Sequence, residues 1–371
     1  MSRGEDYYKY LLALNYFLSW GPLTLKNLLD NFPSPRKIWE AKISDLEQFG
    51  INKKSASAFA EARSKINPER AWEKLKKEKI KMLSLEDSEY PELLKEIYAA
   101  PLCLYYRGNI NLLQDPLLAI VGSRKCSSYG LQAIQRILTN LLNNYEINTV
   151  SGLALGIDTQ VHKSTLEENQ ATVAVLGSGI DRTSLYPGQN RALAEKIINQ
   201  NGLVISEFPP GIPALKQNFP QRNRIVSGVS LGTWVVEAAS RSGALITANY
   251  ALEQNREVMA LPGNIFSPTS AGTNQLIKKG AKLIENADEI AETLNLTKTE
   301  KSANNNKQIE FDLSETEKTV LSSLTYEPRD INRVIKETNL TTSEVSSNLS
   351  LLELKGIIQK TGDSKYFKLY N

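Results

Sequence analysis

The sequence contains no run of about 18 apolar residues, which is the length that a membrane-spanning helix requires. Its first ten residues, MSRGEDYYKY, hold acids and tyrosines where a signal peptide has an apolar core. We therefore expect a cytoplasmic protein. The 371 residues, with a hydrophobic fraction of 41% and a charged fraction of 23%, are typical of a globular chain of two or three domains.

Cysteine and histidine are nearly absent, which excludes several kinds of site. The chain has two cysteines, Cys103 and Cys126, and one histidine, His162. These are too few for a disulfide framework or a zinc site with four Cys or His ligands, and they leave little room for a His-based catalytic triad. A Walker lysine motif is also missing, so the sequence predicts neither a metal nor a nucleotide cofactor. The net charge of +3 is too small to identify a nucleic-acid partner by itself.

Residues 1–80 are expected to be helical. Runs such as YYKYLLALNYF and AWEKLKKEKI place apolar residues three and four positions apart, with Pro and Gly breaks between them. The short FGI sequence at 49–51 resembles the turn of a helix-hairpin-helix motif that contacts a DNA backbone. Because it lacks the second glycine of that motif, an ordinary turn between helices is the preferred interpretation.

Residues 81–296 change to apolar, β-rich runs separated by helical stretches. The runs are LLAIVGS (117–123), INTVSGL (147–153), ATVAVLGSG (171–179), GLVISEF (202–208), GTWVVEA (232–238), EVMALPG (257–263) and AKLIE (281–285). Continuously apolar strands that alternate with helices indicate a parallel sheet covered on both faces. We expect an α/β fold with an extended Rossmann-like core.

Residues 297–310 are polar and read as a linker, and residues 311–371 predict three helices followed by a hairpin that turns at TGDS. This order is typical of a winged helix, whose third helix can enter a DNA groove. Residues 310–371, however, hold eight Lys or Arg and ten Asp or Glu, a net charge of −2. A net acidic domain binds phosphates poorly, so protein contact is the preferred role of this tail.

Ligands of open parallel sheets bind beyond the carboxyl ends of the strands, and the ends of the expected strands here are rich in glycine. The first is followed by Gly122, Ser123 and Arg124, and the next two by SGLALGID (151–158) and GSGIDRTSLYPGQN (177–190). Glycines allow a backbone to approach a ligand, although each of them alone indicates no more than a tight turn. Arg124 is placed to add a guanidinium to such a site.

The stretch NFPQRNRIVSG (218–228) adds an aromatic ring and two guanidinium groups. Residues 209–236 contain Lys216, Arg222 and Arg224 and no acid. Such a basic segment suits a strand of several phosphates, and Phe219 offers a face for base stacking. The alternative for Phe219 is a place in the core.

Four acids also lie near strand ends and are candidate general acids or bases: Asp158, Asp181, Glu207 and Glu237. More often such residues cap helices or hold arginines in place, which is the interpretation that we prefer. A contact between Asp158 and His162, one helical turn apart, is expected to be structural.

The motifs GSR, SGLALGIDTQVH, GSGIDRTSLYPGQN, SEFPPGIPALKQNFPQRNRIVSG and VVEAASRSGALITANYALEQNREVMALPGNIFSPTSAGTNQLIKKGA resemble the DNA-processing protein A family, also called Smf, over residues 85–290. The resemblance implies a single-stranded-DNA-binding protein that protects incoming DNA in natural transformation, loads the RecA recombinase, dimerises through its Rossmann core and is not an enzyme. It assigns DNA contacts to Arg124 within GSR, to Lys216 and Phe219, and further to Arg222, Asn223 and Arg224. Lys163 is a possible further contributor.

Two alternatives remain open. The segment from VVEAASRSGALITA to AGTNQL also resembles Rossmann-like phosphoribohydrolases, which cleave nucleoside monophosphates with a compact PGGxGTxxE loop. Here Pro262-Gly263 and Gly272-Thr273 are separated by residues 264–271, so that loop is missing. The second alternative is an adaptor protein whose working part is the winged helix.

Overall fold

The computed structural model describes residues 4–299, 313–325, 328–361 and 364–368. The chain forms two compact units, Met1–Thr299 and Glu300–Asn371. The expected linker 297–310 starts in the first unit, where Glu146 N donates to Thr297 O at 3.0 Å and Thr299 N donates to Asn144 O at 2.9 Å. The rest of that linker, from residue 300, lies outside the described residues. The domain boundaries expected near residues 80, 297 and 311 stay predictions.

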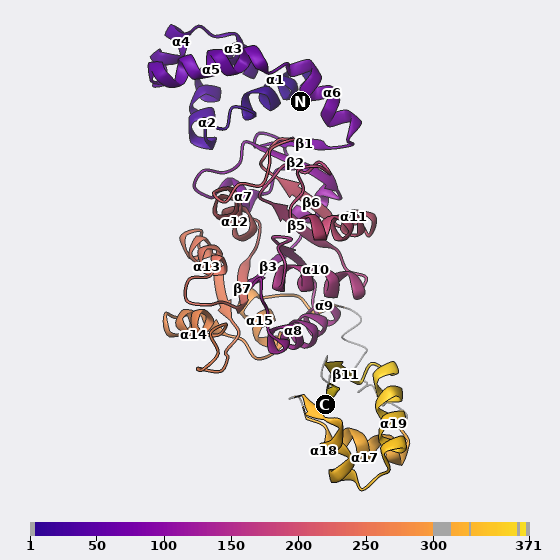
Figure 1. Cartoon of the computed structure of the whole chain (residues 1–371). Helices are drawn as coiled ribbons and strands as arrows, with labels where there is room; N and C mark the ends of the chain where they lie inside the picture. Colours follow the sequence, from indigo (N-terminus) through magenta and orange to yellow (C-terminus); the bar gives the residue numbers. More distant parts are fainter. Residues whose placement is uncertain (1–3, 300–312, 326–327, 362–363, 369–371) are drawn as a thin grey trace. The chain divides into compact units, whose positions relative to one another are not determined.

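Helices make up the first part of the chain, as the spacing of its apolar residues predicts (Figure 1). They are α1 (Glu5–Asn15), α2 (Pro22–Asn31), α3 (Pro35–Glu40), α4 (Ile43–Gln48), α5 (Lys53–Lys65) and α6 (Pro68–Lys77). Proline occupies the first position of α2, α3 and α6, where a missing N–H costs no helical hydrogen bond. The FGI sequence joins α4 to α5, with Gly50 at a left-handed φ of 86°. It is therefore a turn between helices.

A nine-stranded sheet follows, in the order β1-β2-β6-β5-β4-β3-β7-β8-β9. Its strands are β1 (Lys81–Ser84), β2 (Cys103–Gly108), β3 (Leu117–Gly122), β4 (Asn148–Ser151), β5 (Thr172–Leu176), β6 (Leu203–Ser206), β7 (Gly232–Glu237), β8 (Glu257–Ala260) and β9 (Lys282–Leu283). β2 pairs antiparallel with β1 and β6, and all other neighbours in this sheet are parallel. Every strand expected from the apolar runs is present, which confirms the Rossmann-like α/β fold.

Helices cover both faces of this sheet (Figure 1). They are α7 (Glu92–Lys95), α8 (Ser128–Ala133), the π-helical turn η2 (Ile134–Leu138), α9 (Thr139–Asn144), α10 (Ile157–Glu167), α11 (Arg191–Asn199), α12 (Asn218–Gly228), α13 (Gly243–Glu253), α14 (Ala271–Lys278) and α15 (Ala287–Leu294), with 3₁₀ turns η1 (Ile110–Leu113) and η3 (Gly188–Asn190). In β3, Leu118 and Ile120 pack with α9, α10 and α15, whereas Leu117, Ala119 and Val121 pack with α12, α13 and α14. This alternation is the two-residue period of a strand buried on both faces.

The described residues of the second unit form three helices and a small sheet, as the sequence predicts for a winged helix. Its elements are α17 (Glu315–Ser323), β10 (Arg329–Asp330), α18 (Ile331–Thr338), α19 (Thr342–Leu354), β11 (Ile358–Thr361) and β12 (Lys365–Lys368). Ser314 with Glu317 and Thr341 with Glu344 form capping boxes that start α17 and α19. β11 and β12 form the expected hairpin, and residues 362–363 of its TGDS turn lie outside the described residues.

Candidate functional site

A hollow of about 680 Å³ lies beyond the carboxyl ends of the central strands. The order of the parallel strands reverses at β3, which has β4 on one side and β7 on the other, and such a switch point is where ligands of this fold bind. We call this hollow the central pocket. Its wall includes seven of the residues that the sequence singles out: Gly122, Ser123, Arg124, Lys216, Phe219, Arg222 and Asn223.

Phe219 lies in the first turn of α12, and its ring is half-buried at the wall of the central pocket. A Cβ built on Gly177 would lie 3.0 Å from Phe219 Cδ1, so the ring packs directly on the backbone that follows β5. Tyr186 approaches the ring from the loop 177–190, with 5.8 Å between centroids and an interplanar angle of 53°. The ring is therefore neither fully in the core nor fully free.

Tyr186 is a residue of the central pocket that the sequence argument missed. Its side chain is 50% exposed, and it offers a second aromatic surface beside Phe219. The loop 177–190 was singled out for its glycines, and the tyrosine within it was the signal that could have been used. A pair of aromatic rings at a basic pocket suits unpaired bases.

Two exposed cations stand at the central pocket. The guanidinium carbon of Arg124 lies 5.4 Å from the centre of the Phe219 ring, a distance typical of a cation–π contact. Lys216 is exposed on the segment that leads into α12. Within the described part of the chain, neither side chain forms an ion pair with a carboxylate. Both charges are therefore available to an anionic ligand.

Arg222 has a different environment from the one that the sequence suggests. Its residue is only 4% exposed, and Nη1 donates to Gly152 O at 2.6 Å and to Val175 O, while Nε donates to Asn223 Oδ1 at 3.1 Å. Gly152 is required here because a Cβ would clash with the guanidinium. Burial lowers the pKa of Arg222 to about 10, against the opposing effect of Asp158, and the group stays charged at neutral pH. Arg222 thus joins α12 to the ends of β4 and β5.

Arg224 faces away from the central pocket. It is 8% exposed, forms an ion pair with Glu207 and is missing from the wall of the hollow. Residues two apart on a helix do not share a face, so Arg222 and Arg224 cannot both point at one ligand from α12. Direct phosphate binding by these two arginines stays a prediction of the sequence, and their geometry favours a scaffolding role.

The remaining predicted residues shape the edge of the central pocket. Ser123 Oγ donates to Lys125 O at 2.8 Å and accepts from Lys125 N at 3.1 Å, which holds the turn after β3. Gly122 has no room for a Cβ, which would lie 2.6 Å from Ile157 Cγ1. Asn223 donates to Gly243 O at 3.3 Å and so connects α12 to α13. Lys163 is exposed on α10 and is not part of the wall.

The four acids near strand ends all have partners, but only Glu207 holds an arginine as the sequence argument preferred, and the other three accept hydrogen bonds from loop or helix-start residues. Glu237 accepts from Ser127 N at 2.9 Å, Asp158 from Ala154 N at 3.3 Å and Asp181 from Gly211 N at 2.5 Å. Glu207 pairs with Arg224. Burial raises the pKa of Asp158 and of Glu207, against the opposing effects of Arg222 and Arg224. In Asp181 burial acts in the same direction, but hydrogen bonds from Thr183 and Gly211 leave its pKa lowered.

His162 is fully buried, and its Nδ1 lies 2.8 Å from Thr172 Oγ1. The expected contact with Asp158 does not occur among the hydrogen bonds of these two described residues, so that prediction was wrong. Burial lowers the pKa of His162 to about 3, and the nearby Arg222 acts in the same direction. The imidazole is therefore neutral and belongs to the core.

Two further properties concern only the part of the chain that the structure describes. There, no group of three or more His, Cys, Asp or Glu side chains is arranged to hold a metal ion. No helix in the same residues is both long and apolar enough to cross a membrane.

The chain is similar to proteins of known families. Residues 81–295 match the family model described as DNA recombination-mediator protein A, and residues 305–363 match the DprA winged helix domain. The chain is 32% identical over 394 residues to the protein Smf of Synechocystis, which covers 95% of this chain and 98% of that protein. It is 40% identical over 262 residues to the protein Smf of Escherichia coli, which covers 69% of each. It is also 44% identical over 213 residues to the DNA processing protein DprA of Streptococcus pneumoniae, which covers 57% of this chain and 74% of that protein.

Two solved structures are similar to this one. The X-ray structure of DNA processing protein A from Streptococcus pneumoniae superimposes with a TM-score of 0.64 at 36% identity and covers 78% of this chain and 98% of its own. The structure of the Helicobacter pylori protein, described as having a unique single-stranded-DNA-binding mode, gives a TM-score of 0.52 at 29% identity. That match covers 58% of this chain and 95% of the Helicobacter chain.

Proposed function

The chain belongs to the DNA recombination-mediator protein A family, the DprA/Smf proteins, and from this premise we propose that it binds single-stranded DNA in the central pocket. The observation that supports the proposal most directly is the pair of exposed cations, Arg124 and Lys216, beside the aromatic rings of Phe219 and Tyr186. The cations can bind phosphates, and unpaired bases can stack on the rings. A duplex hides its bases and should bind less well.

Each side chain has a proposed role in this binding. Arg124 and Lys216 contact phosphates, and Phe219 or Tyr186 stacks on a base. The turn at Gly122 and Ser123 brings backbone close to the strand. Arg222 is a buried part of the wall, where its charge adds to the positive field without a direct contact.

The bound strand is proposed to be a substrate for recombination. We propose that the protein protects incoming single strands in the cytoplasm during natural transformation and loads the RecA recombinase onto them. The support for this step is the family resemblance and the family name, DNA recombination-mediator protein A.

We also propose a homodimer that forms through the Rossmann-like core. Ile265 and Phe266 follow β8 and are 80% and 86% exposed, an uncommon degree for two adjacent large apolar side chains. A second copy of the chain would bury them. Replacing both by Ser should convert a dimer to a monomer in light scattering, and an unchanged mass would contradict this assignment.

Catalysis is not part of the proposal. The acids Asp158, Asp181, Glu207 and Glu237 all accept hydrogen bonds or pair with an arginine, and none is left as an obvious general base. The phosphoribohydrolase alternative requires turnover of a nucleoside monophosphate. Release of free base on incubation with such nucleotides would revive it.

The binding proposal is tested by fluorescence anisotropy with single- and double-stranded oligonucleotides at several salt concentrations, in EDTA and without nucleotide. We expect preference for the single strand, little dependence on sequence and a steep loss of affinity with salt. Arg124→Ala should weaken binding and make the slope of log K against log salt shallower by about 0.7, the value for one phosphate of a single strand. Lys125→Ala is the matched control, because Lys125 is exposed next to Arg124 but outside the pocket wall. Equal affinity for the duplex would contradict the proposal.

A further inference from the structure

The carboxyl edge of the sheet continues beyond the central pocket, along β5 and β6 toward the N-terminal helices. The loop after β5 first carries the exposed Arg182 and then Tyr186, which lies at the pocket. The loop after β6 passes through Gly211 before it reaches Lys216 and the pocket wall. Each loop therefore has one part at the central pocket, at Tyr186 or Lys216, and another part at the carboxyl edge of β5 and β6, at Arg182 or Gly211.

Hydrogen bonds hold these two loops together. Gly211 N donates to Asp181 Oδ1 at 2.5 Å, and Gly179 N donates to Ile212 O at 2.8 Å. Arg182 directly follows Asp181 in the chain. Its backbone is thus fixed beside Gly211.

The N-terminal helices contact the same place. Tyr16 Oη donates to Pro210 O at 2.7 Å, and a Cβ built on Gly211 would lie 3.2 Å from Lys74 Nζ. Lys74 is an exposed residue of α6. Lys74 Nζ therefore lies beside Gly211, which is hydrogen-bonded to the residue that precedes Arg182.

Side chains of both charges lie at this place. Asp181 is buried, and its carboxylate already accepts from Gly211 N and from Thr183 and Ser184. Glu73 lies beside Lys74 on α6 and Glu78 directly follows the helix, yet in the described residues neither forms an ion pair with Lys74. The charge of Lys74 does act on Asp181, whose pKa it helps to lower. Arg182 has no carboxylate partner among the described residues. Lys74 and Arg182 are thus two exposed cations that no ion pair neutralises within the described residues, in addition to Arg124 and Lys216.

We propose that a single strand leaving the central pocket continues past Tyr186 along this edge, and that Arg182 and Lys74 contact its phosphates. This inference rests on the proposed function and adds the N-terminal helices to the DNA-binding surface. The site takes the phosphodiester backbone of a single strand, without base readout. Strands long enough to leave the central pocket engage it, and shorter ones do not.

The test compares two oligothymidines, of about 5 and about 20 nucleotides. The first lies near the lower end, and the second beyond the upper end, of the site sizes of about 4–16 nucleotides found for other single-strand-binding folds. Anisotropy titrations of the full chain with the Arg182→Ala/Lys74→Ala double variant should show roughly tenfold weaker binding of the long strand and less than twofold for the short one. The salt slope for the long strand should become shallower by about 1.4, the value for two phosphates of a single strand.

The Lys53→Ala/Lys54→Ala variant is the matched control. It removes the same charge from two exposed residues of the N-terminal helices, on α5, and should leave both titrations near wild type. Equal losses in the control and the test variant would show a general effect of net charge and overturn the inference, as would unchanged binding of the long strand. Absence of short-strand binding by the wild-type chain would instead count against the central pocket, so the two failures are distinguishable. Unchanged thermal unfolding of the double variant checks that it is folded.

Discussion

Phe219 has three neighbours that fix the orientation of its ring: the backbone at Gly177, the guanidinium of Arg124 and the ring of Tyr186. A half-buried ring held in this way loses little conformational freedom when a base stacks on it, because its rotamer is already set. Arg124 is oriented by the same ring.

Replacing Phe219 with Ala separates stacking from packing. Binding of a single strand should weaken by about 1–3 kcal/mol, the range for one base–aromatic stack, with little change in salt dependence. The free energy of unfolding should fall by less than the about 3–5 kcal/mol typical of a fully buried phenylalanine, since the ring is only half-buried. Phe219→Tyr, which keeps the ring, is the control. A large loss of stability with unchanged DNA affinity would assign Phe219 to the core.

His162 provides a pH-dependent test of the fold beneath the central pocket. Its folded pKa is about 3 and the unfolded value about 6.5, so the unfolded chain takes up a proton first as the pH falls. The contribution of neutral His162 to the free energy of unfolding is fully present above pH of about 6.5 and falls as the pH decreases below it. Between pH 7 and 5.5 the free energy of unfolding should fall by about 1 kcal/mol. Denaturant unfolding of the wild type and of His162→Asn at both pH values measures this. If the variant shows the same acid sensitivity as the wild type, the imidazole is not its source.

Among the elements, β3 to β9 were predicted correctly, because each of them coincides with an apolar run of the sequence. β1 and β2 were not predicted. β1 begins with the exposed Lys81 and has only four residues, so its apolar signal is weak. β2 is buried at Cys103, Leu104 and Tyr105, so its signal was present in the sequence and was missed. The direction of Arg224 was also not predictable from composition, because it depends on the helical phase of α12 relative to Arg222.

Arg222 connects α12 to the sheet through hydrogen bonds. Arg222→Met keeps an extended side chain but removes the donors to Gly152 O and Val175 O. Buried acceptors left without partners cost about 1–3 kcal/mol, so the unfolding free energy should fall by that amount. Arg222→Lys should restore only part of it, since an ammonium lacks the planar fork. Weaker DNA binding at full stability in Arg222→Met would instead indicate a direct phosphate contact.

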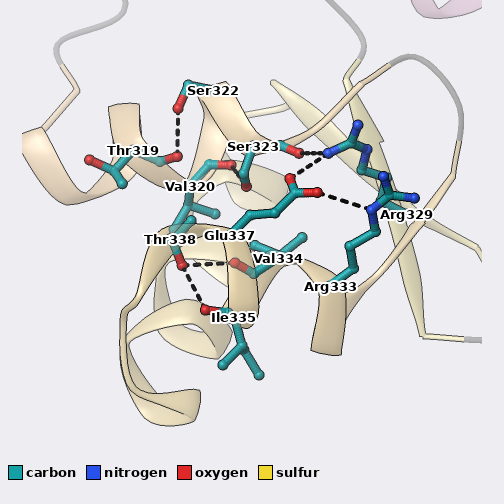
Figure 2. Close-up of polar contacts among 10 residues, drawn as sticks. All are labelled: Thr319, Val320, Ser322, Ser323, Arg329, Arg333, Val334, Ile335, Glu337 and Thr338. Atoms are coloured by element: carbon teal, nitrogen blue, oxygen red, sulfur yellow. Dashed lines mark hydrogen bonds and ion pairs between the residues drawn. The ribbon is translucent and has the colours of Figure 1, made fainter.

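In the whole molecule, the two units differ in whether their basic side chains are paired with acids. Figure 2 shows that Arg329 and Arg333 of the second unit both bind Glu337, with Nη1 of Arg329 2.6 Å from Oε2 and Nε of Arg333 3.0 Å from Oε1. Arg329 also donates to Ser323 O at 2.7 Å. The third helix, α19, contains no Lys or Arg. Its position in a winged helix suits a DNA groove, but its composition does not.

Removing the second unit should therefore leave single-strand binding intact. Because Thr297 and Thr299 hydrogen-bond to Glu146 and Asn144 of the core, the chain is best ended after residue 299. The shortened chain should fold, bind short single strands within about twofold of the full chain and keep the same salt slope, because Arg124 and Lys216 both remain. Anisotropy titration and thermal unfolding of the two chains test this, and binding of a protein partner or higher-order assembly is the property expected to be lost. A folded core that no longer binds DNA would show that the acidic tail, despite its charge of −2 over residues 310–371, is part of the DNA-binding surface.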